Sequence, residues 1–492
     1  MRIAKLISFA LAITFIAANN ASAANQPNII LIMADDLGRG ELGCYGQQKI
    51  KTPRIDELAA EGLRFTQFYA GSPVCAPSRC TLMTGKHTGN AAIRDNREKG
   101  PWTALAQKYE PVFTGQEPLP DDEVTIAELL KARGYATAAI GKWGLGHFGT
   151  SGDPNKQGFD LFYGYNCQRH AHNHYPAFLW RNDQKEPLPG NDGKNATGTH
   201  SQKKFTEEAL KFIHEHKEGP FFLYLPYIIP HLAIQPPKSA LDHYAGQFPE
   251  ADHDDKSHYI KHPTPRAGYA AMVSYLDSEV GKIVDLVDEL GLDKNTLILF
   301  TSDNGPTYER AGGADSTYFN STAGLRGRKT EVYEGGIRVP MIARWTGKVA
   351  SGGTIDSPGA LWDLLPTLSE LAGAAPPIDG DGVSLLDLIV EAKPLPPREY
   401  FYWEYPTHGG QQAVRWGDWK GVRTKLFEGP QPWQLYDLAA DEQEVFDVAA
   451  EHPDVVARID EAARESHVGS KQFPFPQLDA KSETQAKQPP AN

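Results

Sequence analysis

The sequence predicts an α/β fold, a large and mostly parallel sheet flanked by helices, with a smaller C-terminal α+β domain. From Asn28 onward, short apolar runs alternate with helical patterns, which is typical of βαβ units. The 492 residues suffice for one large domain and a smaller partner. After Pro394, aromatic strand-like runs replace this alternation and predict a separate β-rich unit.

The predicted elements follow in order along the chain. Strands are expected at 28–33, 136–140, 221–227, 296–300 and 339–345, with helices at 53–61, 122–132, 204–216, 266–290 and 361–372. In the helix at 266–290, Met272, Leu276, Val280 and Ile283 recur at three- or four-residue spacing, so this apolar stripe should pack on the sheet. Three C-terminal strands, at 400–405, 413–422 and 433–438, precede a last helix at 453–466.

The N-terminal segment has the pattern of a secretory signal. Arg2 and Lys5 precede an apolar run, and small residues lead to a cleavage site after Ala23. No later run approaches ~18 apolar residues, and no cysteine follows the cleavage site to carry a lipid anchor. We therefore expect a periplasmic or secreted protein without a stable membrane anchor.

The domain boundaries follow from composition. A signal peptide at 1–23 would precede a large domain at 24–375, which Gly- and Pro-rich breaks separate from a small β-rich subdomain at 376–470. The polar, Pro- and Gln-rich end, 471–492, is expected to be disordered.

Charge and cysteine content exclude some classes of protein. With 49 Lys+Arg against 62 Asp+Glu, the net charge of −13 excludes a generally basic surface that binds nucleic acid. Four cysteines are too few for a disulfide-built scaffold. Bridges among Cys44, Cys80 and Cys167 remain open.

Acidic side chains follow two of the predicted strands. Asp35 and Asp36 end the first strand, and Asp303 and Asn304 follow the strand at 296–300. In a parallel sheet both pairs lie at the carboxyl edge, and carboxylates so close would repel unless a cation sat between them. Oxygen ligands favour Ca²⁺ or Mg²⁺, whereas a lone Asp-Asp pair is more often a helix cap or a turn.

A glycine motif and a cysteine followed by a proline come after these aspartates. Gly38, Gly40 and Gly43 fit G-x-G-x-x-G, but the aspartates before them would face a pyrophosphate, so they are interpreted as turn residues. Pro77 fits the first position of a helix, which would put Cys75 at the positive end, suited to a nucleophile acting on an anion. An isolated cysteine is more often buried or disulfide-bonded.

Together these motifs resemble the formylglycine-dependent sulfatases of the alkaline phosphatase superfamily, and among them bacterial polysaccharide sulfatases. The C-x-P-S-R sequence at 75–79 is accompanied, in the family's order, by NIILIMADDLG, GKWGLG at 141–146, PFFLYLPYIIPH at 220–231, TSDNG at 301–305 and LRGRKTEVYEGGIRVP at 325–340. The resemblance spans about Pro27 to Ala372 and implies an alkaline phosphatase-like fold and a sulfuric ester hydrolase.

The resemblance also implies roles for individual residues. Cys75 would be matured by a formylglycine-generating enzyme to formylglycine, whose hydrate attacks sulfur. Arg79 would hold the hydrate, Lys142 and Lys329 would neutralise the sulfate, and His231 would serve the leaving oxygen as a general acid. One Ca²⁺, with Mg²⁺ as the alternative, would be held by Asp35, Asp36, Asp303, Asn304 and the modified residue 75.

One position departs from the family pattern. Many members read G-K-W-H-L-G, with the histidine serving the formylglycine, but this chain has Gly144 there. The role would pass to His147, to His87 or to none.

The substrate expected from the resemblance is a sulfated carbohydrate, with galactose or N-acetylgalactosamine sulfate favoured, and the 4-sulfate first. His170, His172 and His174 would share a face if their segment were extended, and with His147 and His408 they are the candidate substrate residues. Arg326 and Arg328, beside Lys329, could make the pocket locally positive, although such a run is more often a solvated loop. Two alternatives remain: a phosphate or phosphonate ester hydrolase of the same superfamily, and a non-catalytic secreted sugar-binding protein.

Overall fold

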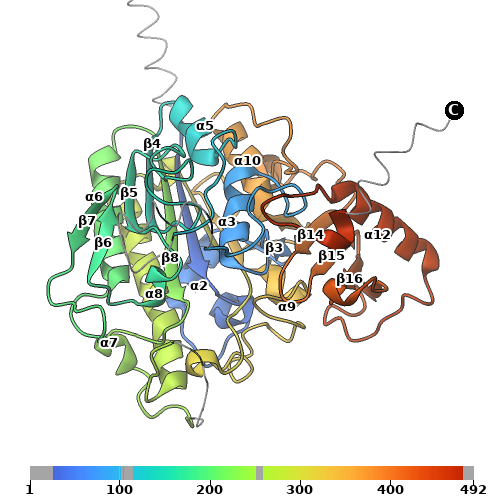
Figure 1. Ribbon diagram of the computed structural model, residues 1–492. Helices are drawn as coiled ribbons and strands as arrows, with labels where there is room; N and C mark the ends of the chain where they lie inside the picture. The colour runs from blue at the N-terminus through green and yellow to red at the C-terminus, as the bar shows by residue number, and fades with distance from the viewer. Residues whose placement is uncertain are drawn as a thin grey trace, which may run out of the picture.

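The computed structural model describes residues 26–98, 115–250 and 259–479, together with 100, 104 and 257. The predicted signal peptide, residues 1–23, lies outside the described residues. In the part of the chain that is described, no helix combines the length and apolar character needed to cross a membrane. Figure 1 shows a large sheet flanked by helices and, beside it, a smaller C-terminal unit.

The large sheet has ten strands within the described ranges, in the order β12-β2-β11-β9-β1-β8-β4-β5-β6-β7. The strands are β1 (Asn28–Asp35), β2 (Leu63–Phe65), β4 (Ala136–Lys142), β5 (Leu161–Tyr165), β6 (Phe178–Arg181), β7 (Gln184–Pro187), β8 (Phe221–Pro230), β9 (Thr296–Ser302), β11 (Met341–Arg344) and β12 (Gly353–Ile355). The five strands from β9 to β5 run parallel, which confirms the predicted fold class. The predicted strand at 339–345 differs, because β11 runs antiparallel to β9.

Both faces of the sheet are covered by helices. Ile30 and Ile32 of β1 lie in one buried cluster with residues of α2 (Pro53–Glu61), α6 (Ser201–His216) and α8 (Pro265–Glu289). Ile29 and Leu31 lie in another cluster with residues of α3 (Cys75–Thr84), α5 (Ile126–Ala132) and α10 (Leu364–Leu371). This two-sided burial explains why the central strands read as continuous apolar runs.

The capping residue Thr125 sets the start of α5, which the apolar pattern alone had placed at residue 122. The helix predicted at 122–132 begins at Ile126, because the Thr125 hydroxyl accepts a hydrogen bond from the Glu128 amide and the Glu128 carboxylate accepts one from the Thr125 amide. The helix at 53–61 is confirmed without change, with Pro53 in its first turn.

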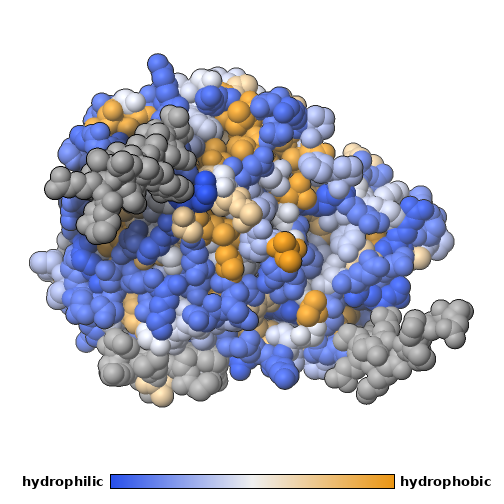
Figure 2. Space-filling model, turned by 90° about the horizontal axis from the view of Figure 1, so that it is seen from above, coloured by the Kyte–Doolittle hydropathy of each residue, from blue (hydrophilic) through white to orange (hydrophobic). Residues whose placement is uncertain are grey.

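The short elements include a second sheet of β3 (Phe68–Tyr69), β10 (Arg338–Val339) and β13 (Gly359–Ala360), and the helices α7 (Lys238–Leu241), α9 (Glu334–Ile337) and α11 (Leu386–Glu391). Figure 2 shows one face of the molecule, where hydrophilic residues dominate and hydrophobic atoms gather in small patches.

The C-terminal unit is an antiparallel sheet covered by one helix. Its strands are β14 (Phe401–Tyr405), β15 (Gln411–Trp416), β16 (Trp419–Arg423) and β17 (Gln434–Asp437), and α12 (Pro453–Ser466) packs on them. The run predicted as one strand at 413–422 forms two, because Gly417, at φ 60°, makes the turn. Buried Lys420 pairs with Glu334 of α9 at 2.9 Å and with Glu444 at 2.9 Å.

The predicted disordered tail is only partly described. Phe473 and Phe475 are buried, so residues 471–479 pack on the folded chain, in contrast to the expectation. Residues 480–492 lie outside the described ranges.

Candidate functional site

The carboxyl edge of the parallel strands brings the predicted acidic pairs together. β1 lies directly beside β9, with Ala34 opposite Ser302, so Asp35 and Asp303 meet at adjacent strand ends. The Asp36 amide donates to Asp303 Oδ1 at 3.1 Å. Asp36 has a φ of 62°, a left-handed conformation that costs a non-glycine residue free energy and is typical of functional sites.

Three buried cations surround these carboxylates. Lys142, at the end of β4, donates to Asp35 Oδ2 at 2.6 Å, and Lys329 donates to Asp36 Oδ2 at 2.8 Å. Arg79 of α3 donates to Asp303 Oδ2 through Nε at 3.1 Å and Nη2 at 2.8 Å. Such charge-assisted contacts compensate for the burial of both sets of charges.

Burial and neighbouring charges shift the pKa values of Asp35 and Asp303 in opposite directions. Burial alone would raise the pKa of Asp35, but the charges of Lys142 and Arg79 outweigh it and hold this pKa far below its usual range. Burial and the neighbouring Asp35 raise the pKa of Asp303 to about 6. Closely packed carboxylates whose pKa values are shifted in opposite directions are common at sites that bind a cation.

Cys75 lies at the first residue of α3, as its predicted place at a helix N-terminus required, although Pro77 is the third residue of the helix and not the first. Its Sγ lies 3.4 Å from Asp35 Oδ1 and 4.0 Å from Asp36 Oδ1. Burial, followed by the charge of Asp35, raises the pKa of the thiol to about 12. All four cysteines of the chain are free, so Cys44, Cys80 and Cys167 form no bridge.

The donor set fits a metal ion. Ligand atoms of Asp35, Asp36, Cys75 and His231 lie within 4.8 Å of one another. Asn304 donates its amide nitrogen to Asp36 Oδ1 at 2.8 Å, and within the described ranges its buried Oδ1 has no hydrogen-bond partner. A buried oxygen without a donor, beside carboxylates, is the arrangement that a cation with oxygen ligands requires.

His231 follows the end of β8 and faces the same cluster. Its Nδ1 donates to the Leu232 carbonyl at 2.6 Å, which leaves Nε2 directed toward Asp36 Oδ2 at 3.6 Å. Burial, with the charge of Lys329, lowers the pKa of His231 well below its ordinary value. Burial therefore favours the neutral form of the imidazole.

A cavity of about 810 Å³ opens over this cluster. Its lining includes four residues named in the sequence analysis, Cys75, His172, His231 and Lys329. The remaining lining residues come from separate loops, and no sequence pattern indicated them: Asn96, Arg97, Glu98, Gln168, Arg169, Tyr259 and Tyr308. Arg169 and Glu98 form an ion pair at 2.8 Å that ties two of these loops together.

The three alternating histidines do not share a face, because residues His170–His172 form a 3-10 turn and not a strand. His170 packs on Tyr165 and Phe178, and His174 packs on His200. His172 alone of the three lines the cavity, where it stacks on His231 with ring centroids 5.0 Å apart.

The other predicted candidates lie away from the cavity lining. His147 packs on Phe148 and Trp180, and His408 stacks on Tyr405. His87 packs on Trp362 and Tyr402.

Two basic residues expected near the pocket contact other groups. Arg326 donates to the Tyr436 hydroxyl at 2.9 Å, and Arg328 pairs with Glu309. Lys329 is thus the member of that run that reaches the acidic cluster.

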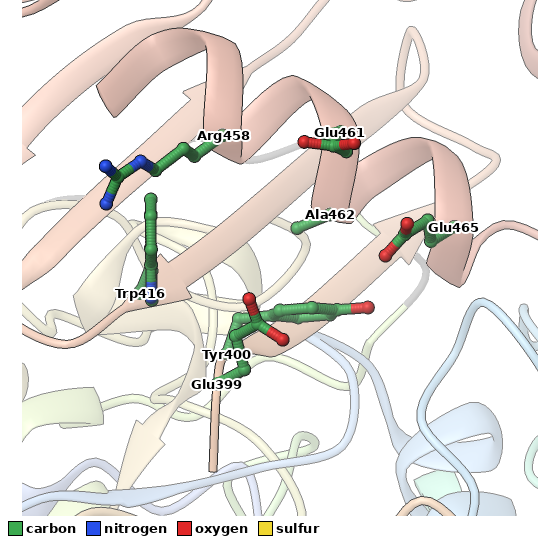
Figure 3. A pocket seen from close by; sticks show the side chains of 7 residues that line it. All are labelled: Glu399, Tyr400, Trp416, Arg458, Glu461, Ala462 and Glu465. Carbon is green, nitrogen blue, oxygen red and sulfur yellow. The ribbon is translucent and has the colours of Figure 1, made fainter. Parts of the chain in front are cut away.

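A second cavity, of about 450 Å³, lies on the C-terminal unit. Figure 3 shows Arg458 beside the Trp416 ring, with Glu461 and Glu465 on the same helix and Glu399 next to Tyr400. An anion there would meet three carboxylates and one guanidinium, so this second cavity is poorly suited to an anionic ligand.

Comparison with known proteins identifies relatives over nearly the whole described chain. The family model described as Sulfatase matches residues 27–374, and the one described as N-sulphoglucosamine sulphohydrolase, C-terminal, matches 328–466. Steryl-sulfatase of Homo sapiens is 32% identical over 80% of this chain and 74% of its own length, and N-acetylgalactosamine-6-sulfatase of Homo sapiens is 34% identical over 79% and 70%. The crystal structure of Ps i-CgsB in complex with k-i-k-neocarrahexaose superposes with a TM-score of 0.74 at 27% identity, covering 94% of this chain and 97% of that one.

Proposed function

The chain belongs to the sulfatase family and is a hydrolase of sulfate esters, and we propose that it acts through a formylglycine matured from Cys75 beside one bound Ca²⁺ ion. The observation that carries the proposal is the convergence of Asp35, Asp36, Cys75, Asp303 and Asn304 at one sheet edge, within reach of three buried cations. Mg²⁺ is the alternative ion.

The environment of Cys75 supports its modification. A thiol whose pKa is raised to about 12 carries almost no thiolate at neutral pH, and the thiolate is the nucleophilic form. Without a metal ion in the site, unmodified Cys75 is therefore a poor nucleophile. A formylglycine hydrate supplies instead a hydroxyl for attack and a second one that allows the sulfate to leave as the aldehyde reforms. We propose a formylglycine-generating enzyme as the maturation partner.

The buried cations suit the binding of a sulfate group. Asp35, Asp36, Asp303, Asn304 and residue 75 would hold the metal ion, which supplies Lewis-acid polarisation of oxygen. Lys142 and Lys329 then stabilise the charge on the sulfate, and Arg79 positions residue 75. An anion in the cavity favours the protonated form of His231, whose Nε2 can then give its proton to the leaving oxygen.

The proposed substrate is a sulfated carbohydrate, with galactose or N-acetylgalactosamine sulfate favoured. The relatives support it through their names, one an N-acetylgalactosamine-6-sulfatase and one solved with a neocarrahexaose. Among the predicted substrate residues, His172 is the one in the cavity and is the first candidate for contact with the sugar. We propose a periplasmic or secreted location, where such polymers are met.

A panel of defined sulfated mono- and disaccharides, read out by released sulfate, tests this proposal. The panel includes the sulfate and the phosphate ester of one alcohol. We expect hydrolysis of galactose or N-acetylgalactosamine sulfates and a clear preference for the sulfate ester. Faster hydrolysis of the phosphate ester would instead favour a phosphoesterase.

A further inference from the structure

Gly144 leaves a space that another side chain fills. It lies two residues after Lys142, in the loop that follows β4, with a φ of 78° that favours glycine. A Cβ added at this position would lie 2.4 Å from Gln168 Nε2 and 3.1 Å from its Cδ. The side-chain amide of Gln168 therefore occupies the room where a side chain of residue 144 would begin.

The side-chain amide of Gln168 has an unused donor beside the cavity over Cys75. Gln168 lines that cavity and is 5% exposed. Among the described residues, no acceptor lies within hydrogen-bonding distance of its buried Nε2. Its backbone is held in place, because the Gln168 amide N–H donates to Gln116 Oε1 at 2.6 Å. A buried N–H group that lacks an acceptor, beside a cavity, can be satisfied by an oxygen of a ligand.

The oxygen that suits this donor is one of a sulfate group. The cavity contains Lys329 and lies beside Lys142, so an anion is the ligand that its charges select. His147 and His87, the side chains that the sequence suggested in place of residue 144, lie among aromatic rings and not in the lining of the cavity.

We propose that Gln168 is a sulfate-binding residue, whose Nε2 donates a hydrogen bond to an oxygen of the bound sulfate group from the space that Gly144 leaves open. The inference rests on the proposed function. It has a chemical consequence, because an amide does not titrate: Gln168 can hold the sulfate but cannot accept or give a proton there.

Binding of inorganic sulfate separates this role from catalysis. Calorimetric titration of Cys75→Ala protein with sodium sulfate, at saturating Ca²⁺, measures affinity without turnover. Adding Gln168→Ala should weaken binding about tenfold or more, since hydrogen bonds to charged groups are the stronger class. Gln168→Glu keeps the size but replaces the donor by a carboxylate, and should weaken binding further.

Two further variants control for a purely structural effect. Gln202 of α6 is also buried, and its side-chain amide has no hydrogen-bond partner among the residues that the structure describes. It is not in the cavity lining, so Gln202→Ala should leave sulfate affinity unchanged. Gly144→Ala places a Cβ against Gln168 Nε2 and also strains the backbone at a φ of 78°, so it should weaken binding, and its further effect should be smaller in the Gln168→Ala background, where the clash with Nε2 is gone.

Unchanged sulfate affinity in Gln168→Ala would overturn the inference alone, whereas a Cys75→Ala parent that binds no sulfate would overturn it together with the proposed function. In enzyme with Cys75 intact, the pH profile of kcat/KM for Gln168→Ala should keep both limbs of the parent profile at a lower level. Loss of one limb would contradict a non-titrating role.

Discussion

Replacing Lys329 by methionine should destabilise the protein strongly without metal and much less with it. Lys329 Nζ lies 2.8 Å from Asp36 Oδ2, and the two side chains are 4% and 1% exposed. At an effective dielectric constant of about 20, this contact is worth about 6 kcal/mol of Coulomb energy, and breaking a buried pair typically costs about 3–5 kcal/mol. Bound Ca²⁺ would neutralise Asp36 in its place, so we expect the loss to fall to less than half.

The assay is urea unfolding followed by tryptophan fluorescence, in EDTA and in saturating Ca²⁺. Lys420→Met is the matched control, because Lys420 is also buried and pairs with Glu334 and Glu444 at 2.9 Å, neither of which is a proposed metal ligand. Its loss of unfolding free energy should be of similar size, about 3–5 kcal/mol, and should not depend on Ca²⁺. An equal loss for Lys329→Met with and without Ca²⁺ would refute the assignment of Asp36 as a metal ligand.

Three further predictions test other parts of the site and the fold. Lys329→Met should also lower kcat/KM by about 10²–10³, since it removes a donor that stabilises the sulfate charge, and Lys420→Met that still folds should retain the parent value. His231→Asn should lower kcat by about 10²–10⁴ for an alkyl sulfate and far less for an aryl sulfate with a good leaving group, and equal losses on both would exclude a proton-donor role. Burial lowers the pKa of His467, but hydrogen bonds to Glu404 at 2.7 Å and Asp479 at 3.1 Å outweigh it and raise this pKa above about 6.5. Protonated His467 therefore stabilises the fold fully below pH ~6.5, and this stabilisation is lost as pH rises through the folded-state pKa. The difference in unfolding free energy between parent and His467→Asn should thus shrink from pH 6 to pH 9. A constant difference would contradict this pairing.

The sequence predicted the parts of the fold that depend on local pattern. Continuous apolar runs gave the central parallel strands, and Asp35 and Asp303 could be placed at one edge because each follows such a run. The antiparallel direction of β11 could not be predicted from the sequence, because the residues of a short apolar strand do not indicate its direction.

The lining of the cavity was mostly beyond the reach of sequence reasoning. Gln168, Tyr259 and Asn96 belong to loops whose approach depends on tertiary contacts. The prediction that the alternating histidines share a face was wrong. A period of two gives a shared face only in a strand, and residues His170–His172 form a 3-10 turn. Gly144 was visible as a departure, but only the three-dimensional structure shows that Gln168 fills its space.

The mass of the peptide that contains residue 75, from protein made in the native host, tests the central claim most directly. Cleavage after Arg64 and Arg79 releases this segment with Cys75 as its single cysteine. Conversion of the thiol to an aldehyde predicts a peptide about 18 Da lighter than the unmodified one. A peptide found only with its thiol, in protein that nonetheless releases sulfate, would contradict the proposed nucleophile.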